Sequence, residues 1–263
     1  MRKWIACGCI GLVSIAISIA AAIHFLLPTG LLYFNYGYAD LPSNMERRTA
    51  IIDNHPVSFL VSKFSENTSK WGFANDPSSP RSVHEWRTFL DAKFVINGSY
   101  FTETNHPSGY YSLDGASSII PWPETAFNEN GYTFAVNINE GKMNIYYIPM
   151  SSMLGPYPGS TFLSFPTLVL NDMPMVAVDS GLHARRTILA ETDDGVIYII
   201  VSEAGEESLY QMAQWLVAQP EHFRIAGNLD GGPSTGLSTL SKPWDIEVQS
   251  AAVPNVVWVD NIQ

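Results

Sequence analysis

Apolar and polar residues alternate over several short stretches of the chain, and this pattern is typical of half-buried β-strands. Strands are predicted at 57–64, 93–97, 223–229 and 253–259. Two more pairs of apolar runs flank turn residues and predict hairpins, one at 132–138 and 142–148, the other at 187–192 and 196–202. The first pair encloses a three-residue Asn-Glu-Gly turn and the second an Asp-Asp-Gly turn.

Two stretches have the period of an α-helix instead. Ser82 and Glu85 have the spacing of a capping box and predict a short helix that runs to about residue 92. A second helix is predicted after residue 208, because Leu209, Met212 and Leu216 fall on one helical face that ends before a proline. Together these elements predict an α+β fold, with a mixed β-sheet and a few packed helices in one domain at 49–261.

The N-terminal residues do not alternate between apolar and polar. Residues 5–27 are almost continuously apolar, and this segment is long enough to span a bilayer of about 30 Å. Arg2 and Lys3 precede it. We expect a transmembrane signal anchor at 1–27 and a tether at 28–48. The protein would then be a single-pass membrane protein with its catalytic domain extracytoplasmic, either periplasmic or extracellular. A signal peptide cleaved near Ala20–Ala22 and a buried core helix remain alternatives.

The composition of the chain excludes some classes of function. A net charge of −11 over 263 residues argues against nucleic-acid binding. Both cysteines, Cys7 and Cys9, lie in the apolar N-terminal stretch, and the six histidines are scattered without a ligand spacing, so no zinc site is expected. No cofactor is predicted. A divalent cation stays open, since acidic residues could hold calcium, although the chain has no EF-hand-like loop.

Three segments place glycines and polar residues at the ends of predicted strands, where they can face a ligand: 97–101, 184–187 and 228–235. In the third, Asp230 follows a strand and precedes two glycines, which permit close backbone approach. Each segment also has a purely structural interpretation. Asp230 and Asn97 could be turn residues, and Arg186 could pair with a surface carboxylate rather than clamp a phosphate.

Taken in order, the segments resemble the phosphodiester glycosidase domain family. The resemblance rests on Asn-Gly-Ser-Tyr-Phe at 97–101, Pro-Thr-Leu-Val at 166–169, Arg-Thr at 186–187, Gln-Met-Ala at 211–213 and Asn-Leu-Asp-Gly-Gly-Pro-Ser at 228–234. It covers roughly residues 50–260. The chain departs from the family pattern at Ser99 and Pro233, and in a shorter loop at 202–207.

The resemblance implies an enzyme that hydrolyses a sugar-1-phosphodiester in a cell-envelope or exopolysaccharide glycan. Its catalytic residues would be Arg186 as phosphate clamp and Asp230 as nucleophile, base or sugar-orienting carboxylate. Glu203 is the first choice for a second carboxylate, before Asp114 and Glu103. The implied substrate-binding residues are Asn97, Gly98, Thr187, Asn228, Gly231, Gly232 and Ser234.

The expected partners are a sugar-phosphate or phosphoglycan substrate and, through the N-terminal helix, a membrane, but no nucleic acid. Two other functions remain open. One is a non-catalytic phosphoglycan-binding module, which would keep the arginine and the glycines without an activated carboxylate. The other is an assembly factor for polysaccharide, which would work through protein partners.

Overall fold

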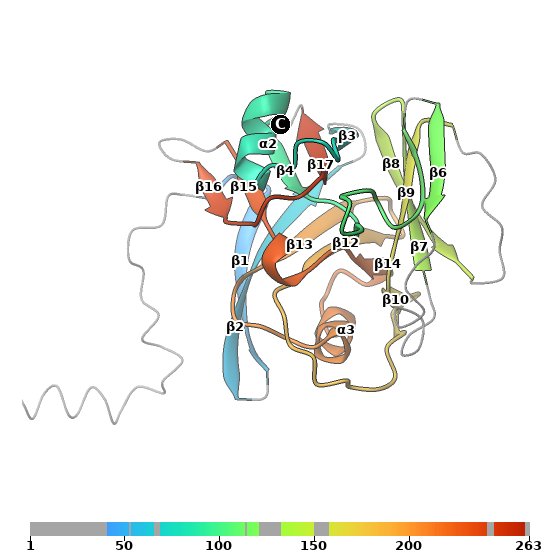
Figure 1. The fold of residues 1–263 in the computed structure, drawn as a ribbon. Helices are drawn as coiled ribbons and strands as arrows, with labels where there is room; N and C mark the ends of the chain where they lie inside the picture. The colour runs from blue at the N-terminus through green and yellow to red at the C-terminus, as the bar shows by residue number, and fades with distance from the viewer. Residues whose placement is uncertain are drawn as a thin grey trace, which may run out of the picture. The chain divides into compact units, whose positions relative to one another are not determined.

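The computed structural model describes residues 41–260, apart from 53, 66–68, 114, 121–132, 150–157 and 241–244. Most of these residues belong to strands of three β-sheets (Figure 1). Every pair of neighbouring strands described in the three sheets is antiparallel.

The largest sheet carries two of the three candidate segments. Its strands follow the order β1 (Met45–Ile52), β2 (His55–Phe64), β13 (Ile197–Ala204), β12 (Thr187–Thr192), β14 (Phe223–Asn228), β10 (Thr167–Leu170) and β11 (Met173–Pro174). The strands predicted at 57–64, 187–192, 196–202 and 223–229 are confirmed here. The central strands β12, β13 and β14 are buried on both faces, which explains their nearly continuous apolar sequence.

The second sheet has the order β16 (Ile246–Val248), β15 (Leu237–Thr239), β4 (Phe94–Asn97), β17 (Asn255–Asp260) and β3 (Lys70–Asn75). The third has the order β6 (Ala116–Ile120), β5 (Gly109–Leu113), β9 (Ser160–Ser164), β7 (Thr133–Asn139) and β8 (Lys142–Ile148). The predicted β7–β8 hairpin is confirmed, but its turn has two residues rather than three. Glu140 and Gly141 both have positive φ, as a tight hairpin turn of this length requires.

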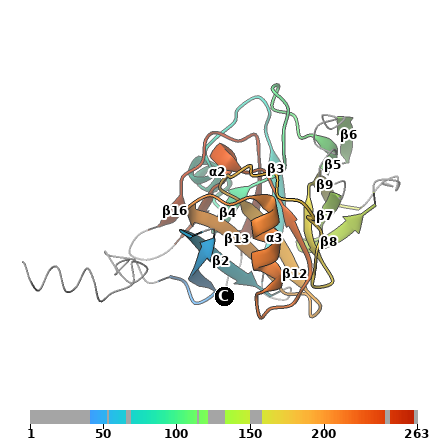
Figure 2. The same cartoon turned by 90° about the horizontal axis from the view of Figure 1, so that it is seen from below.

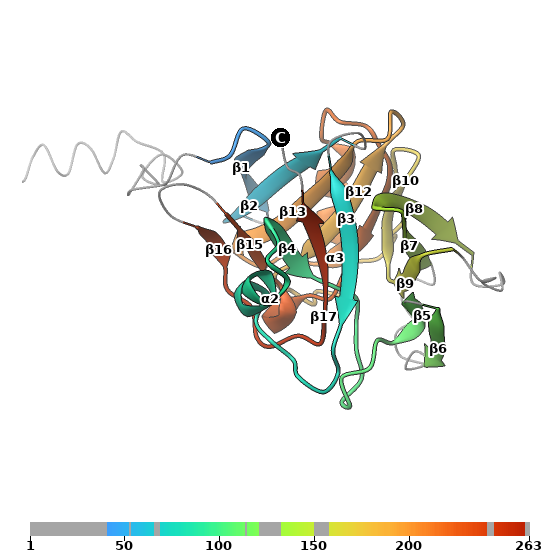
Figure 3. The ribbon, with the colours of Figure 1, turned by 90° about the horizontal axis from the view of Figure 1, so that it is seen from above.

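Two α-helices are present among the described residues, and both start at a capping box. In α2 (Val83–Leu90) the box is formed by Ser82 and Glu85, and in α3 (Leu209–Val217) by Ser208 and Gln211. The buried face of α3 packs on the largest sheet (Figure 2). Helix α2 packs on the second sheet, beside β4 and β15 (Figure 3). Both predicted helices are therefore confirmed.

The main core lies where all three sheets meet. Its apolar side chains come from the face of the largest sheet that points away from α3, from the second sheet and from the third, for example Leu189, Ile96 and Phe134. A second cluster fills the space between α3 and the opposite face of the largest sheet. The ends of β4, β12 and β14, which carry the three candidate segments, are thus held by packing on both sides.

The prediction of an α+β fold with a mixed sheet is wrong, because the described chain is mainly antiparallel β-structure with two short helices. The physical reason lies in the short strands β5, β6, β9 and β15. They carry serines, threonines and glycines, so their sequences lack a clear alternation of apolar and polar residues. Pairing with neighbouring strands, rather than local pattern, makes them extended.

The predicted transmembrane segment at 1–27 lies outside the described residues, as does most of the predicted tether; β1 begins at Met45, within its last residues. Within the part of the chain that the structure describes, no helix is long and apolar enough to cross a bilayer. This finding counts against the prediction of a single-pass membrane protein, and the extracytoplasmic location of the domain stays a prediction.

Candidate active site

Asn97, at the end of β4, joins the three candidate segments. Its side-chain Nδ2 donates to the backbone oxygen of Asp230 at 2.8 Å, and its Oδ1 accepts from the Thr187 hydroxyl at 2.7 Å and from the Gly236 backbone N–H at 3.1 Å. The side chain is completely buried. The amide is therefore fully engaged by protein groups, which makes Asn97 a cross-link between segments rather than an open sugar contact.

Thr187 and Gly98 also have structural tasks. The Thr187 hydroxyl is used for Asn97 and is completely buried. At Gly98, a Cβ would lie 2.0 Å from Oδ1 of Asn255, so a glycine is needed where this side chain crosses the strand end. Both residues are predicted to bind substrate. In the structure they also hold the segments together, and their role in substrate binding stays a prediction.

Arg186, just before β12, is buried with its guanidinium beside the loop that follows β14. Its Nε donates to the Glu207 backbone oxygen at 3.1 Å and its Nη2 to the Leu182 backbone oxygen at 2.8 Å. Its Nη1 has no hydrogen-bond acceptor among the described residues and lies 3.5 Å from where a Cβ of Gly231 would be. Burial lowers the pKa of Arg186 from its usual value, although the group remains a cation at any physiological pH.

Asp230 lies in the same loop, next to Gly231. Its backbone N–H donates to the Gly98 oxygen at 3.2 Å, and its carboxylate accepts from the Gly231 N–H at 2.9 Å and from the Ser234 hydroxyl. Burial raises the pKa of Asp230, and these two hydrogen bonds oppose the rise. The carboxyl is thus partly desolvated and held in a fixed orientation.

The glycines after Asp230 shape this loop. A Cβ on Gly231 would lie 2.9 Å from the Arg185 backbone oxygen, so any side chain there would push the loop away from Arg186. Gly232 has a φ of +59° and donates its N–H to the same Arg185 oxygen at 2.8 Å. The two glycines therefore bring the loop against the start of β12, as close backbone approach requires.

Tyr100 is a site residue that the sequence analysis did not single out. Its hydroxyl accepts from Nδ2 of Asn228 at 2.7 Å, and its ring stacks on Phe165 with centroids 4.5 Å apart. Burial and then the charge of Asp230 raise the pKa of Tyr100, while the charge of Arg186 lowers it. The phenol therefore lies within electrostatic reach of both candidate catalytic groups.

Several buried polar atoms around this cluster have no hydrogen-bond partner among the described residues. They include Oδ1 of Asn228, Oγ of Ser99 and Oγ1 of Thr235. Buried polar atoms are nearly always paired in folded proteins. These three atoms belong to the segments that carry Asn97 and Asp230, so the interior of the cluster is polar.

Glu207 is a second carboxyl beside Arg186 that the sequence analysis does not single out. Its Oε1 accepts from the Ser202 hydroxyl at 2.5 Å, its Oε2 has no hydrogen-bond partner among the described residues, and the side chain is completely buried. Burial raises its pKa to about 7, opposed by Ser202 and by the charge of Arg186. Its position directly before the α3 capping box is visible in the sequence, but its burial beside Arg186 is not.

The other carboxyl candidates are elsewhere. Glu203 forms a two-point ion pair with Arg47, at 2.5 and 2.6 Å, and accepts from the Ser58 hydroxyl. Glu103 is exposed, and Asp114 lies outside the described residues. No group of three or more histidine, cysteine, aspartate or glutamate side chains that could hold a metal is found within the described ranges.

The cluster can therefore offer one phosphate-binding cation and up to two carboxyls with raised pKa. Asn97, Arg186 and Asp230, which come from three distant parts of the sequence, meet at one end of the strands as predicted. Asn228 and Ser234 are also at this site, through the contacts of their side chains with Tyr100 and Asp230. The roles of all these residues in binding or catalysis stay predictions.

Comparison with solved structures shows the same fold in distant relatives. The zebrafish N-acetylglucosamine-1-phosphodiester alpha-N-acetylglucosaminidase catalytic domain, auto-inhibited by its pro-peptide, matches with a TM-score of 0.59 and 15% identity, over 86% of each chain. A hypothetical protein from Synechocystis matches with a TM-score of 0.55 and 13% identity, over 82% of this chain and 61% of that one. At these identities the likeness concerns the fold alone.

The sequence comparisons are more specific. No curated protein matches the chain. The family model described as phosphodiester glycosidase matches residues 91–259, a span that contains every residue of the cluster and more than half of the chain. The chain therefore belongs to the phosphodiester glycosidase family.

Proposed function

We propose that the protein hydrolyses a sugar-1-phosphodiester and releases the free sugar and a phosphate monoester. The observation that carries the proposal is the meeting of Arg186 and Asp230 at Gly231. There a guanidinium nitrogen with no acceptor among the described residues and a partly desolvated carboxyl flank the same backbone position. Family membership supports a glycosidase of this general kind.

In the proposed reaction, Arg186 binds the phosphate oxygens through its free Nη1. A water molecule forms a bond to the anomeric carbon, and the bond from that carbon to the phosphate oxygen breaks. Asp230 accepts the proton of the attacking water. The charge on the departing phosphate increases during this step, and the buried guanidinium stabilises it more strongly than solvent would.

The remaining groups have supporting roles in this proposal. Asn228 and Ser99 are buried, so they would support the loops of the site from behind rather than contact the sugar directly. The Tyr100 hydroxyl, already bonded to Asn228, would lie nearer to the sugar. Asn97 and Thr187 would act by holding the loops in register rather than by contacting substrate.

The experiment uses a methyl diester of N-acetylglucosamine-1-phosphate, chosen because the zebrafish relative is named for this linkage. Arg186→Lys keeps the charge but loses the Nε and Nη2 bonds that fix the position of Nη1, so we expect binding of the diester to weaken about 10- to 150-fold, on the scale of a charge-assisted hydrogen bond. Asp230→Asn keeps the size of the side chain but removes the base, so we expect turnover to fall by about 10²- to 10⁴-fold.

Two matched controls remove similar groups elsewhere. Arg48→Lys changes an arginine on β1 that is paired with Glu46 and Glu221. Asp245→Asn removes a carboxylate that is paired with Arg87. Both should leave turnover near wild type. Binding of the diester without any turnover by the wild type would favour a non-catalytic binding module, and unchanged turnover in Asp230→Asn would exclude the proposed base.

A further inference from the structure

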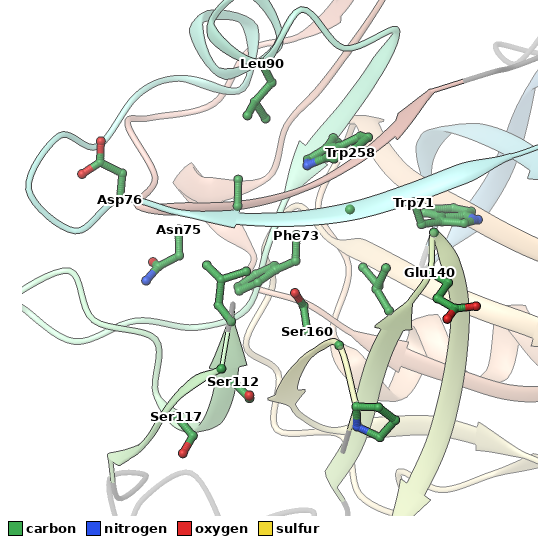
Figure 4. Close-up of a pocket in the computed structure, with 18 of the residues that line it drawn as sticks. Trp71, Phe73, Asn75, Asp76, Leu90, Ser112, Ser117, Glu140, Ser160 and Trp258 are labelled. Atoms are coloured by element: carbon green, nitrogen blue, oxygen red, sulfur yellow. The ribbon is translucent and has the colours of Figure 1, made fainter. Parts of the chain in front are cut away.

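A cavity of about 950 Å³ lies along the free edge of β3, and neither Arg186 nor Asp230 lines it (Figure 4). Residues of β3 form one wall, and residues of β5, β7 and β9 form the wall facing it. We call this cavity the β3 groove. Its volume is at the upper end of the range of about 300–1,000 Å³ that encloses a compact organic ligand.

The backbone of β3 offers hydrogen-bonding groups to this groove. β3 is the last strand of its sheet, and its register with β17 turns the N–H and C=O groups of alternate residues away from the sheet. The N–H of Trp71 points away from the sheet in this way, because it donates to the Gly141 oxygen at 2.8 Å rather than to β17. By the same alternation, the backbone groups of Phe73 and Asn75 point into the groove.

Side chains add polar groups beside this edge. Oδ1 of Asn75 is buried and has no hydrogen-bond partner among the described residues. Asn75, Ser112, Ser117 and Ser160 face the same space between β3 and the third sheet (Figure 4). The groove therefore presents an amide and several hydroxyls together with the strand edge.

Two of the aromatic rings that line the groove lie one on each side of β3 (Figure 4). Phe73 lies on the side of the third sheet, and Trp258 on the opposite side of β3 (Figure 4). A Cβ on Gly72 would lie 2.1 Å from the Trp258 indole, so the glycine lets this ring lie flat across the strand. Apolar ring faces combined with a few fixed polar groups are typical of small-molecule sites, and they match the apolar faces and hydroxyl rims of sugar rings.

The charge of the lining distinguishes the groove from the Arg186 site. No lysine, arginine or histidine is among the described residues that line it, whereas Asp76 and Glu140 are. Asp76 is neutralised by Arg81 at 3.0 Å. Such a lining disfavours a phosphate and favours an uncharged ligand.

Strand β9 connects the groove to the Asp230 site. Ser160, at the start of β9, lines the groove, and Ser164, at its end, donates its hydroxyl to the Asn228 oxygen at 2.8 Å. At the strand rise of about 3.3 Å per residue, these serines are about 13 Å apart. Asn75 is likewise paired in register with Asn255, whose side chain lies against Gly98.

We propose that the β3 groove binds the uncharged sugar units that adjoin the phosphodiester in the substrate. This inference rests on the proposed function, since it divides one substrate between two sites: the charged phosphodiester at Arg186 and a short neutral oligosaccharide at β3. Substrates with a longer neutral glycan then bind more tightly than minimal ones, without any change in the chemical step.

The test measures binding of neutral trisaccharides of glucose, mannose and N-acetylglucosamine by calorimetry, with no phosphate present. We expect at least one to bind the wild type and Arg186→Lys equally. Asn75→Ala and Trp258→Leu should each weaken that binding by about tenfold or more, on the scale of a lost hydrogen bond or ring contact. Met173→Ala, which removes an exposed side chain on β11, is the control and should bind as the wild type does.

Folding is controlled separately. Asn75→Ala removes a buried oxygen that has no partner, so its melting temperature should not fall. The proposal that the β3 groove binds sugar is wrong if none of the three trisaccharides binds. It is also wrong if the groove variants bind as tightly as the wild type. Trisaccharide binding without turnover of the methyl diester would instead count against the proposed function and leave the groove in place.

Discussion

Glu207 is the residue where burial and charge conflict most clearly. Its carboxyl is completely buried beside Arg186, with one oxygen paired to Ser202 and the other without a partner in the described part of the chain. Burial raises its pKa from 4.5 to about 7. Between these two pH values the folded protein holds a proton that the unfolded chain has released, so the free energy of unfolding must decrease as the pH rises through this window.

Replacing the Glu207 carboxyl tests whether its raised pKa makes the stability of the protein depend on pH. In the wild type, the shift predicts a loss of stability on the order of 3 kcal/mol between about pH 4.5 and pH 7. Glu207→Gln keeps the acceptor for Ser202 but cannot ionise, so its stability should change less over the same range. Urea unfolding at pH 5 and pH 8 gives both slopes. Equal slopes for the two proteins would show that Glu207 does not carry the effect.

For single residues, the sequence identifies the segments that form the candidate site better than it identifies the role of each residue. Asn97, Arg186 and Asp230 could be selected because each stands with glycines or polar neighbours at the end of an apolar strand. The separate role of each residue could not be predicted in this way. The amide of Asn97 is fully hydrogen-bonded to groups from residues 187, 230 and 236, which lie 90, 133 and 139 positions away in the sequence. Glu207 was missed for the same reason.

At the scale of elements, the helix starts are the most local feature of the fold. Both α2 and α3 begin at a serine whose side chain accepts from the backbone three residues on. The spacing at Ser82 predicts α2, whereas α3 is predicted from its apolar face and its cap at Ser208 is a finding of the structure. The short strands could not be predicted, because β5, β9 and β15 are extended only through pairing with their neighbours.

The two caps allow a matched comparison. Ser82→Ala and Ser208→Ala should each lower the free energy of unfolding by about 1 kcal/mol, since each exposes a helix N–H that the serine had satisfied. Only Ser208 directly follows Glu207, whose backbone oxygen holds Arg186. We therefore expect turnover of the methyl diester to fall in Ser208→Ala and to stay normal in Ser82→Ala. Equal activity in the two variants would separate the α3 cap from the site.

At the scale of the whole domain, the three sheets depend on one another through the shared core. The clearest contact is between Gly227 on β14 and Phe134 on β7. A Cβ on Gly227 would lie 2.2–2.5 Å from three atoms of the Phe134 ring. Gly227 directly precedes Asn228, so the packing of the third sheet also determines where the candidate site begins. No local pattern in the sequence indicates this contact, because it joins residues 93 positions apart.

A double-mutant cycle measures this coupling. Gly227→Ala should destabilise the domain by about 1–3 kcal/mol, the usual cost of overpacking a core. Phe134→Leu shortens the ring that the new methyl group would meet, so the double variant should be more stable than the sum of the two single changes predicts, by about 1 kcal/mol or more. The control cycle pairs Gly227→Ala with Ser82→Ala at the α2 cap, where the changes should add within about 0.5 kcal/mol. Chemical unfolding of the six proteins, including the wild type, gives every term. Additivity in both cycles would mean that the largest and third sheets do not meet at Gly227.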